Sequence, residues 1–269
     1  MRRKPAVAGS FYPSKRGDLL EMVERMVQPQ LKKEKAICVV SPHAGFIYSG
    51  PVAGAVFSSV ELPDTYVILG PSHGSIASRF AIMKEGIWET PIGDVTLESS
   101  LAELINNYSP LIIEDESPHL DEHSLEVQLP FIQYFKENIS IVPICFSYDV
   151  SYEELVNLAK AVSQGIQEFR REVLIVASTD MSHYVSQKIA EEKDFLAIEK
   201  VLKLDPKGLY DTVKREDMSM CGFHPTTSAL IASRELGAKE AKLIKYQTSG
   251  DTSGDYSQVV GYAGLRITR

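Results

Sequence analysis

Three of the six histidines in this chain stand just beyond short apolar runs that are typical of buried strands. They are His43, His73 and His183. Imidazole titrates near neutral pH and is the commonest metal ligand, so these residues could bind a metal ion or move protons. In open α/β sheets, ligands bind beyond the carboxyl ends of the strands. The sequence therefore predicts a shared polar or metal site at this edge, although each histidine taken alone could serve only to cap a turn.

Asp180 lies three residues before His183, in the segment that follows the third of these strands. If Thr179–His183 begins a helical turn, the two side chains share one face. A carboxylate beside an imidazole favours the charged imidazolium. We therefore expect His183 to be a proton donor near the site. The alternative is that Asp180 only caps the turn and His183 faces solvent.

The segment His119–His123 matches the H-x-x-E-H pattern of one class of zinc peptidases. On a helix, imidazoles four residues apart share a face and can bind zinc. However, Pro118 precedes the segment, and Asp121 is a good N-cap residue. These two residues favour a helix that starts after Asp121, which leaves His119 outside it. A zinc peptidase is therefore the weakest of the functions considered.

A helix that starts at this point would present Glu122, His123 and Glu126 near its beginning. The two glutamates are four residues apart and would share a face. We expect the two carboxylates and the imidazole of His123 to face the same crevice as an acid/base set. Acidic residues are also favoured in the first turn by the helix dipole, which is the alternative explanation for the glutamates.

The three cysteines fall into two groups. Cys38 and Cys145 lie inside apolar strands and are expected to be packed thiols. Cys221 lies in a turn just before a predicted helix, where the helix N-terminus lowers a thiol pKa and raises the thiolate fraction. A thiolate there could be a nucleophile or a metal ligand. The spacing contains no C-x-x-C, which excludes a zinc knuckle.

Strands and helices that alternate along the chain would position these residues. Continuous apolar runs suit a sheet that is covered on both faces. The predicted strands are Ala36–Ser41, Thr65–Gly70, Ile139–Phe146, Glu172–Ser178 and Gln258–Ile267. The predicted helices are Gly17–Val27, Glu98–Asn106, Glu122–Lys136, Tyr152–Arg170, Gln187–Leu204 and Thr226–Leu236. This order predicts an α/β fold, with a central, mostly parallel sheet flanked by helices, in one domain spanning 1–269.

Composition excludes several classes of protein. The 269 residues include 28 Lys and Arg against 36 Asp and Glu, a net charge of −8 that argues against a nucleic-acid-binding protein. The sequence contains no run of about 18 apolar residues, the length that a membrane-spanning helix needs. Few cysteines and no apparent signal peptide lead us to expect a cytoplasmic protein. No G-x-G-x-x-G follows a strand, so a nicotinamide or flavin enzyme is not expected.

Several ordered motifs together give this sequence a family resemblance along nearly its whole length. It resembles the Memo family (mediator of cell motility) and, within it, the prokaryotic proteins encoded beside an AMMECR-type protein and a radical-SAM enzyme. The matching segments are Pro5–Pro13, Ser41–Gly45 with Tyr48–Gly50, Leu69–His73, Asp121–Glu126 with Leu129–Pro130, Ser178–His183, Cys221–Gly222, Ser249–Asp251 and Gly254–Tyr256.

The resemblance implies a fold similar to that of the class III extradiol (LigB-like) non-haem iron dioxygenases. Those enzymes hold Fe(II) with two histidines and a carboxylate and leave positions open for substrate and O₂. The resemblance places His43 and His73 as the two imidazole ligands and Cys221 in the third position. A thiolate there is softer than a carboxylate and favours copper or zinc, so iron is expected first, with copper or zinc as alternatives.

The resemblance also implies that His123, Asp180 and His183 surround the metal ligands or form the acid/base set. The first functional hypothesis is a metal-binding protein with a dioxygenase-like site and redox chemistry on an unidentified substrate. The second hypothesis is a module that binds a peptide or small ligand in the same pocket without turnover, because the family includes signalling proteins. AMMECR-type and radical-SAM proteins are the expected protein partners.

Overall fold

The computed structural model describes residues 1–74 and 76–269. At its centre, parallel strands lie in the order β6, β8, β3, β9, β2. Their bounds are β2 Cys38–Ser41, β3 Thr65–Pro71, β6 Asp94–Leu97, β8 Ser140–Phe146 and β9 Val173–Ser178. The predicted α/β fold with a mostly parallel central sheet is confirmed. Because the strands run in parallel, their carboxyl ends meet at one edge.

Shorter and antiparallel strands extend this centre on both sides into one sheet of 12 strands within the described residues. On one side β12 pairs with β2, and β11 and β10 pair with β12, all antiparallel. The other side ends in β5 and β1, while β4 joins β8 to β7. The bounds are β1 Arg2–Arg3, β4 Phe80–Ile82, β5 Ile87–Glu89, β7 Ile112–Glu114, β10 His183–Val185, β11 Glu240–Thr248 and β12 Val259–Thr268.

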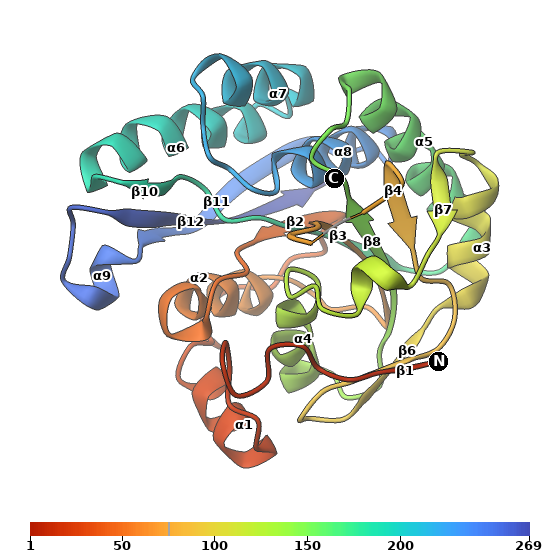
Figure 1. Ribbon diagram of the computed structural model, residues 1–269, viewed down its shortest axis with the longest axis horizontal. Helices are drawn as coiled ribbons and strands as arrows, with labels where there is room; N and C mark the ends of the chain where they lie inside the picture. Colours follow the sequence, from red (N-terminus) through yellow and green to blue (C-terminus); the bar gives the residue numbers. More distant parts are fainter. Residues whose placement is uncertain (75) are drawn as a thin grey trace.

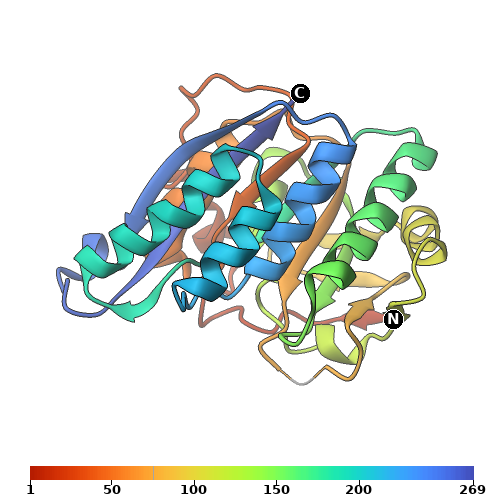
Figure 2. The ribbon, with the colours of Figure 1, turned by 90° about the horizontal axis from the view of Figure 1, so that it is seen from above.

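Helices cover both faces of the sheet (Figure 1). Seen from above, α5, α8, α7 and α6 lie side by side over one face (Figure 2). The helices α1, α2 and α4 cover the other face, and the short α9 precedes β12. The bounds are α1 Arg16–Glu24, α2 Phe46–Ser58, α3 Ser99–Asn107, α4 Leu129–Phe135, α5 Tyr152–Phe169, α6 Gln187–Leu202, α7 Pro206–Arg215, α8 Phe223–Glu235 and α9 Gly250–Ser253.

The two covered faces explain why the central strands are apolar without alternation. In β3, Val67 and Leu69 pack into the core beneath α5 and α8, whereas Tyr66 and Ile68 pack into the core with α2 and α4. Neither face of the strand meets water, so both sets of side chains are apolar. None of the described helices combines the length and apolar character needed to cross a membrane.

Local structure differs from the sequence expectation at places where packing overrides local propensity. Helix α2 contains Pro51 and two glycines and was not predicted. Gly54 lets it pack closely, because a Cβ there would lie 2.4 Å from the backbone oxygen of Met26. The helix expected from Glu122 begins only at Leu129, after a 3₁₀ turn. The helical turn expected at 179–183 is instead a loop that leads into β10.

Candidate metal centre

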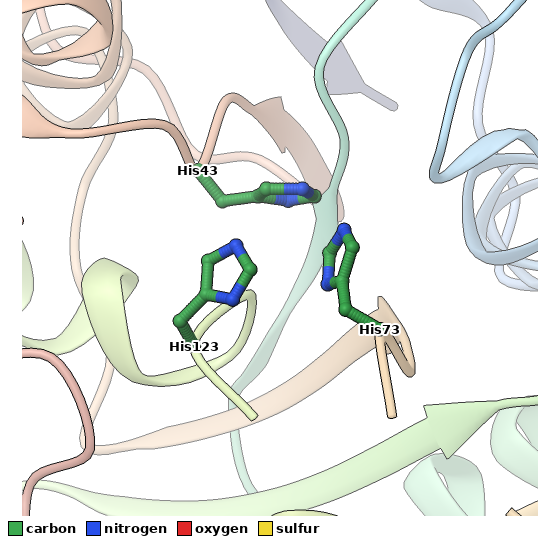
Figure 3. A group of neighbouring side chains, drawn as sticks. All are labelled: His43, His73 and His123. Carbon is green, nitrogen blue, oxygen red and sulfur yellow. The ribbon is translucent and has the colours of Figure 1, made fainter. Parts of the chain in front are cut away.

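His43, His73 and His123 meet at the carboxyl edge of the parallel strands. Their potential ligand atoms all lie within 4.8 Å of one another. His43 follows β2, His73 follows β3, and His123 lies in the loop that precedes α4. Figure 3 shows the three rings turned toward one another from these separate segments. The strand-end rule, that ligands of an open α/β sheet bind beyond the carboxyl ends of its strands, therefore located two of the three imidazoles. The third imidazole, that of His123, comes from a loop.

The hydrogen bonds of Ser178, the last residue of β9, fix the proton on His43. The Ser178 hydroxyl donates its only proton to the Ser124 carbonyl oxygen at 2.6 Å and accepts from the Gln128 side-chain amide at 2.9 Å. His43 Nδ1 lies 2.9 Å from the same oxygen and must therefore be the donor. His43 thus carries its proton on Nδ1, which leaves the Nε2 lone pair for a ligand.

His73 is oriented by Glu122. Its Nδ1 lies 2.9 Å from Glu122 Oε1, while its backbone N–H donates to Oε2 at 2.5 Å. The backbone N–H of Ser124 donates to Oε1 at 2.7 Å. Burial opposes ionisation of Glu122, but the hydrogen bonds that its carboxylate accepts from His73 and from the Ser124 backbone outweigh this effect and lower the pKa of Glu122 to about 2. The carboxylate therefore accepts the Nδ1 proton of His73 and leaves Nε2 free, an arrangement common at metal sites.

His123 stacks on His73, with ring centroids 4.4 Å apart, and its Nδ1 lies 3.5 Å from Glu122 Oε1. Burial lowers its pKa, although Glu122 opposes the shift. Burial also lowers the pKa of His43 well below its usual range, and His123 and His73 lower it further. Neutral imidazoles are the form that binds metal ions. His43 and His123 are therefore poised as ligands near neutral pH.

Cys221 lies two residues before α8 and contacts His43, with Sγ 3.2 Å from Nε2. The Asp180 backbone N–H points at the sulfur from 3.3 Å. Burial raises the pKa of the thiol, and Asp180 raises it further, so the lowering expected from the helix N-terminus is wrong. The metal-ligand role of Cys221 stays a prediction, because the structure groups His123 with His43 and His73 instead.

Asp180 and His183 lie close to His43 but do not form the expected pair. Asp180 Oδ1 accepts the backbone N–H of His43 at 2.8 Å, and burial raises its pKa to about 6. His183 Nδ1 lies 2.9 Å from the carbonyl oxygens of Met181 and Ser219, so it carries a proton there and leaves Nε2 open. The described side chains of Asp180 and His183 share no ion pair. The reason is that residues 179–182 form no helix, so the spacing of three residues does not place the two side chains on one face.

Glu126 does not face the imidazoles, contrary to expectation. It is fully buried, and its carboxylate accepts hydrogen bonds from Arg3, Ala6 and Tyr12. Of the two glutamates, Glu122 is the one that meets the histidines. The expectation failed because the segment from 122 to 125 is a loop, so Glu122 and Glu126 do not share a helix face.

His119 is completely buried outside the three-histidine group, with Nδ1 3.4 Å from Cys145 Sγ. It lies in a 3₁₀ turn that ends before His123 begins the next segment. The two imidazoles therefore share no helix face, and the zinc-peptidase spacing has no counterpart in the fold.

The sequence analysis did not identify Ser178 and Gln128 as residues that support the site. A polar residue at the end of an apolar strand was the only local signal for Ser178.

Comparison with known proteins agrees with the motifs. A family model described as Memo-like protein matches residues 3–266. A MEMO1 family protein of Pyrobaculum arsenaticum is 40% identical over 279 aligned positions, covering 99% of each chain. One of Methanothermobacter thermautotrophicus is 40% identical over 277 positions, covering 98% of this chain and 100% of the relative. One of Methanopyrus kandleri is 39% identical over 283 positions and covers both chains fully. This chain therefore belongs to the Memo family.

Proposed function

We propose that this chain binds one transition-metal ion between His43, His73 and His123 and uses it for redox chemistry on a small substrate. The observation that carries the proposal is the donor set, three imidazoles with ligand atoms within 4.8 Å of one another. At metal–nitrogen bond lengths of about 2.0–2.1 Å, ligand nitrogens lie at most about 4.2 Å apart, so small ring rotations bring them into range.

Iron is the metal we propose first, with copper or zinc as alternatives. Imidazole suits all three metals, whereas a thiolate favours copper or zinc. In the class III extradiol dioxygenases, two histidines and a carboxylate hold Fe(II); here His123 would take the place of the carboxylate. Cys221 would add a soft ligand if it also binds. A bound iron or copper ion would supply open coordination positions and a change of oxidation state.

The residues around the three imidazoles have distinct tasks in this proposal. Ser178 and Glu122 hold the Nδ1 protons of His43 and His73, so that both rings present Nε2. Asp180 fixes the backbone at His43. His183 keeps Nε2 open and is placed to take or give one proton, since its Nδ1 proton is held by carbonyl oxygens.

The proposal is tested by loading tag-free protein with Fe(II) without oxygen and then following O₂ consumption with candidate substrates. We expect one bound iron per chain and substrate-dependent O₂ uptake. In His183→Ala, the iron content should be retained while turnover drops by about 10²–10⁴, the usual size of acid–base assistance. Loss of iron in this variant would make His183 a ligand, and unchanged turnover would remove it from the proton-transfer step.

Ligand binding without turnover is the second candidate. Tyr184 favours it, because this ring is 73% exposed beside His183, with ring centroids 6.0 Å apart, and offers an aromatic surface next to the site. A peptide or small molecule that binds the metal-loaded protein without O₂ uptake would support this function. AMMECR-type and radical-SAM proteins are the first protein partners to test in the same binding assay.

A further inference from the structure

Arg3 and Glu126 form an ion pair in the interior of the protein, on the side of the metal centre nearest the N-terminus. Nη1 of Arg3 lies 2.6 Å from Oε2 of Glu126, and their side chains are 1% and 0% exposed. Arginine and glutamate are almost never fully buried unless they are paired. The pair joins β1, at the start of the chain, to the turn that leads into α4.

The remaining donors of Arg3 hold the loop that carries His123. Nε donates to the carbonyl oxygen of His119 at 2.6 Å, and Nη2 donates to that of Glu122 at 2.7 Å. The guanidinium also lies over the Trp88 ring, 4.1 Å from its centroid. One planar group therefore fixes the loop on both sides of Glu122, the residue that orients His73. A lysine could not do this, because it lacks the rigid fork of donors.

Glu126 holds the N-terminal segment in turn. Its carboxylate accepts the backbone N–H groups of Ala6 at 2.7 Å and Val7 at 3.1 Å, together with the hydroxyl of Tyr12. The ring of Phe11 in this segment lies 4.8 Å from that of His123. The segment is therefore a wall of the site, although it contains none of the three histidines.

We propose that Arg3 and Glu126 are positioning residues of the metal centre. They hold the backbone of Glu122 and thereby set where the Glu122 carboxylate and the His123 ring lie. The inference rests on the proposed metal binding and adds a requirement to it: the geometry of the site depends on a buried ion pair with the N-terminal strand. Neither residue touches the metal ligands with its charged group, so neither is catalytic.

The test compares Arg3→Lys with the matched variant Arg2→Lys by Co²⁺ titration, followed by visible absorption. Arg2 lies in the same strand, but it is 52% exposed, and among the described residues its ion-pair partners are Glu89 and Asp94 on the surface. We expect Arg3→Lys to weaken Co²⁺ binding by about 10–100-fold, the usual effect of removing support behind a ligand. The spectrum at saturation should also change, since it reports ligand geometry and not stability. Arg2→Lys should keep the affinity and spectrum of the parent.

If folded Arg3→Lys keeps the Co²⁺ affinity and the spectrum of the parent, the inference is overturned. It is also overturned if Arg2→Lys loses as much Co²⁺ affinity as Arg3→Lys. If Arg3→Lys does not fold, Tyr12→Phe decides by the same two measurements, because it removes a single hydrogen bond to Glu126. A weaker affinity with an altered spectrum in Tyr12→Phe supports the inference, and parental values overturn it. Absence of Co²⁺ binding in the parent would instead refute the proposed function.

Discussion

Ser178 shows how a single hydroxyl can determine which nitrogen of a histidine is available to a metal. It is completely buried, and its hydrogen bonds to Ser124 and Gln128 leave it only as an acceptor for His43. Metal-binding imidazoles almost always donate their other N–H to a hydrogen-bond acceptor. The partner keeps the ring oriented before the metal arrives.

Ser178→Ala should therefore weaken metal binding by about 10–100-fold, because the Nδ1 proton of His43 loses its acceptor. Co²⁺ titration of the folded variant measures the effect. Ser228→Ala is the matched control, since this buried hydroxyl bonds to the Leu155 carbonyl oxygen between α5 and α8. The same affinity in both variants would show that Ser178 does not support His43.

His119 is a second residue whose environment makes a direct prediction. Burial lowers its pKa to about 4, below the value near 6.5 of an unfolded chain. Between these values the unfolded chain binds a proton that the folded protein does not, so the free energy of unfolding falls as pH decreases from about 6.5 to about 4. At pH above 6.5 both states are neutral, and the contribution is fully present.

Urea unfolding of the parent and of His119→Phe at several pH values tests this. The parent should lose up to about 3 kcal/mol more than the variant between pH 6.5 and 4, from 1.36 kcal/mol per pKa unit. Taking the difference between the two proteins cancels the carboxylates and the other histidines. An identical pH dependence in both would mean that folding does not shift the pKa of His119.

At the level of elements, the loops after the strands carry more of the site than the helices do. The strand-end rule placed His43 and His73 correctly because it depends only on the parallel order of the strands. It could not place the carboxylates, because Arg3 holds the loop before α4 from 119 residues away in sequence. Contacts of this kind leave no periodic pattern in the local sequence.

Helix α2, which begins three residues after His43, gives a prediction at this scale. In Gly54→Ala the added Cβ would meet the backbone oxygen of Met26 at 2.4 Å, so α2 must shift. We expect a loss of about 1–3 kcal/mol in the free energy of unfolding, as for other overpacked interiors.

Gly17→Ala in α1 is the control for this substitution, because nothing lies within 4 Å of its Cβ position. It should leave stability unchanged or raise it by up to about 1 kcal/mol, since alanine is the better helix former. Urea unfolding of the two variants gives both values. Equal stabilities would mean that the contact between α2 and Met26 leaves room for a Cβ at Gly54.

Across the whole molecule, the sheet separates two cores and brings distant segments to one edge. The apolar runs predicted this architecture well, because strands buried on both faces must be apolar throughout. Several elements were not predicted, among them helix α2, which contains Pro51 and packing glycines, and strand β11, which is only partly buried. The meeting of His123 with the strand-end histidines is a property of the complete fold and of no local pattern.

Co²⁺ titration of tag-free, metal-free protein probes the three-histidine site itself, by comparing the parent with His123→Ala and His119→Phe. We expect the parent and His119→Phe each to bind one equivalent of Co²⁺. In His123→Ala, one of the three ligands is lost, so Co²⁺ binding should weaken by about 100-fold or more. Loss of a residue that only hydrogen-bonds to a ligand typically weakens metal binding by about 10–100-fold. Failure of the parent to bind, or parental affinity in folded His123→Ala, would contradict a metal centre built from His43, His73 and His123.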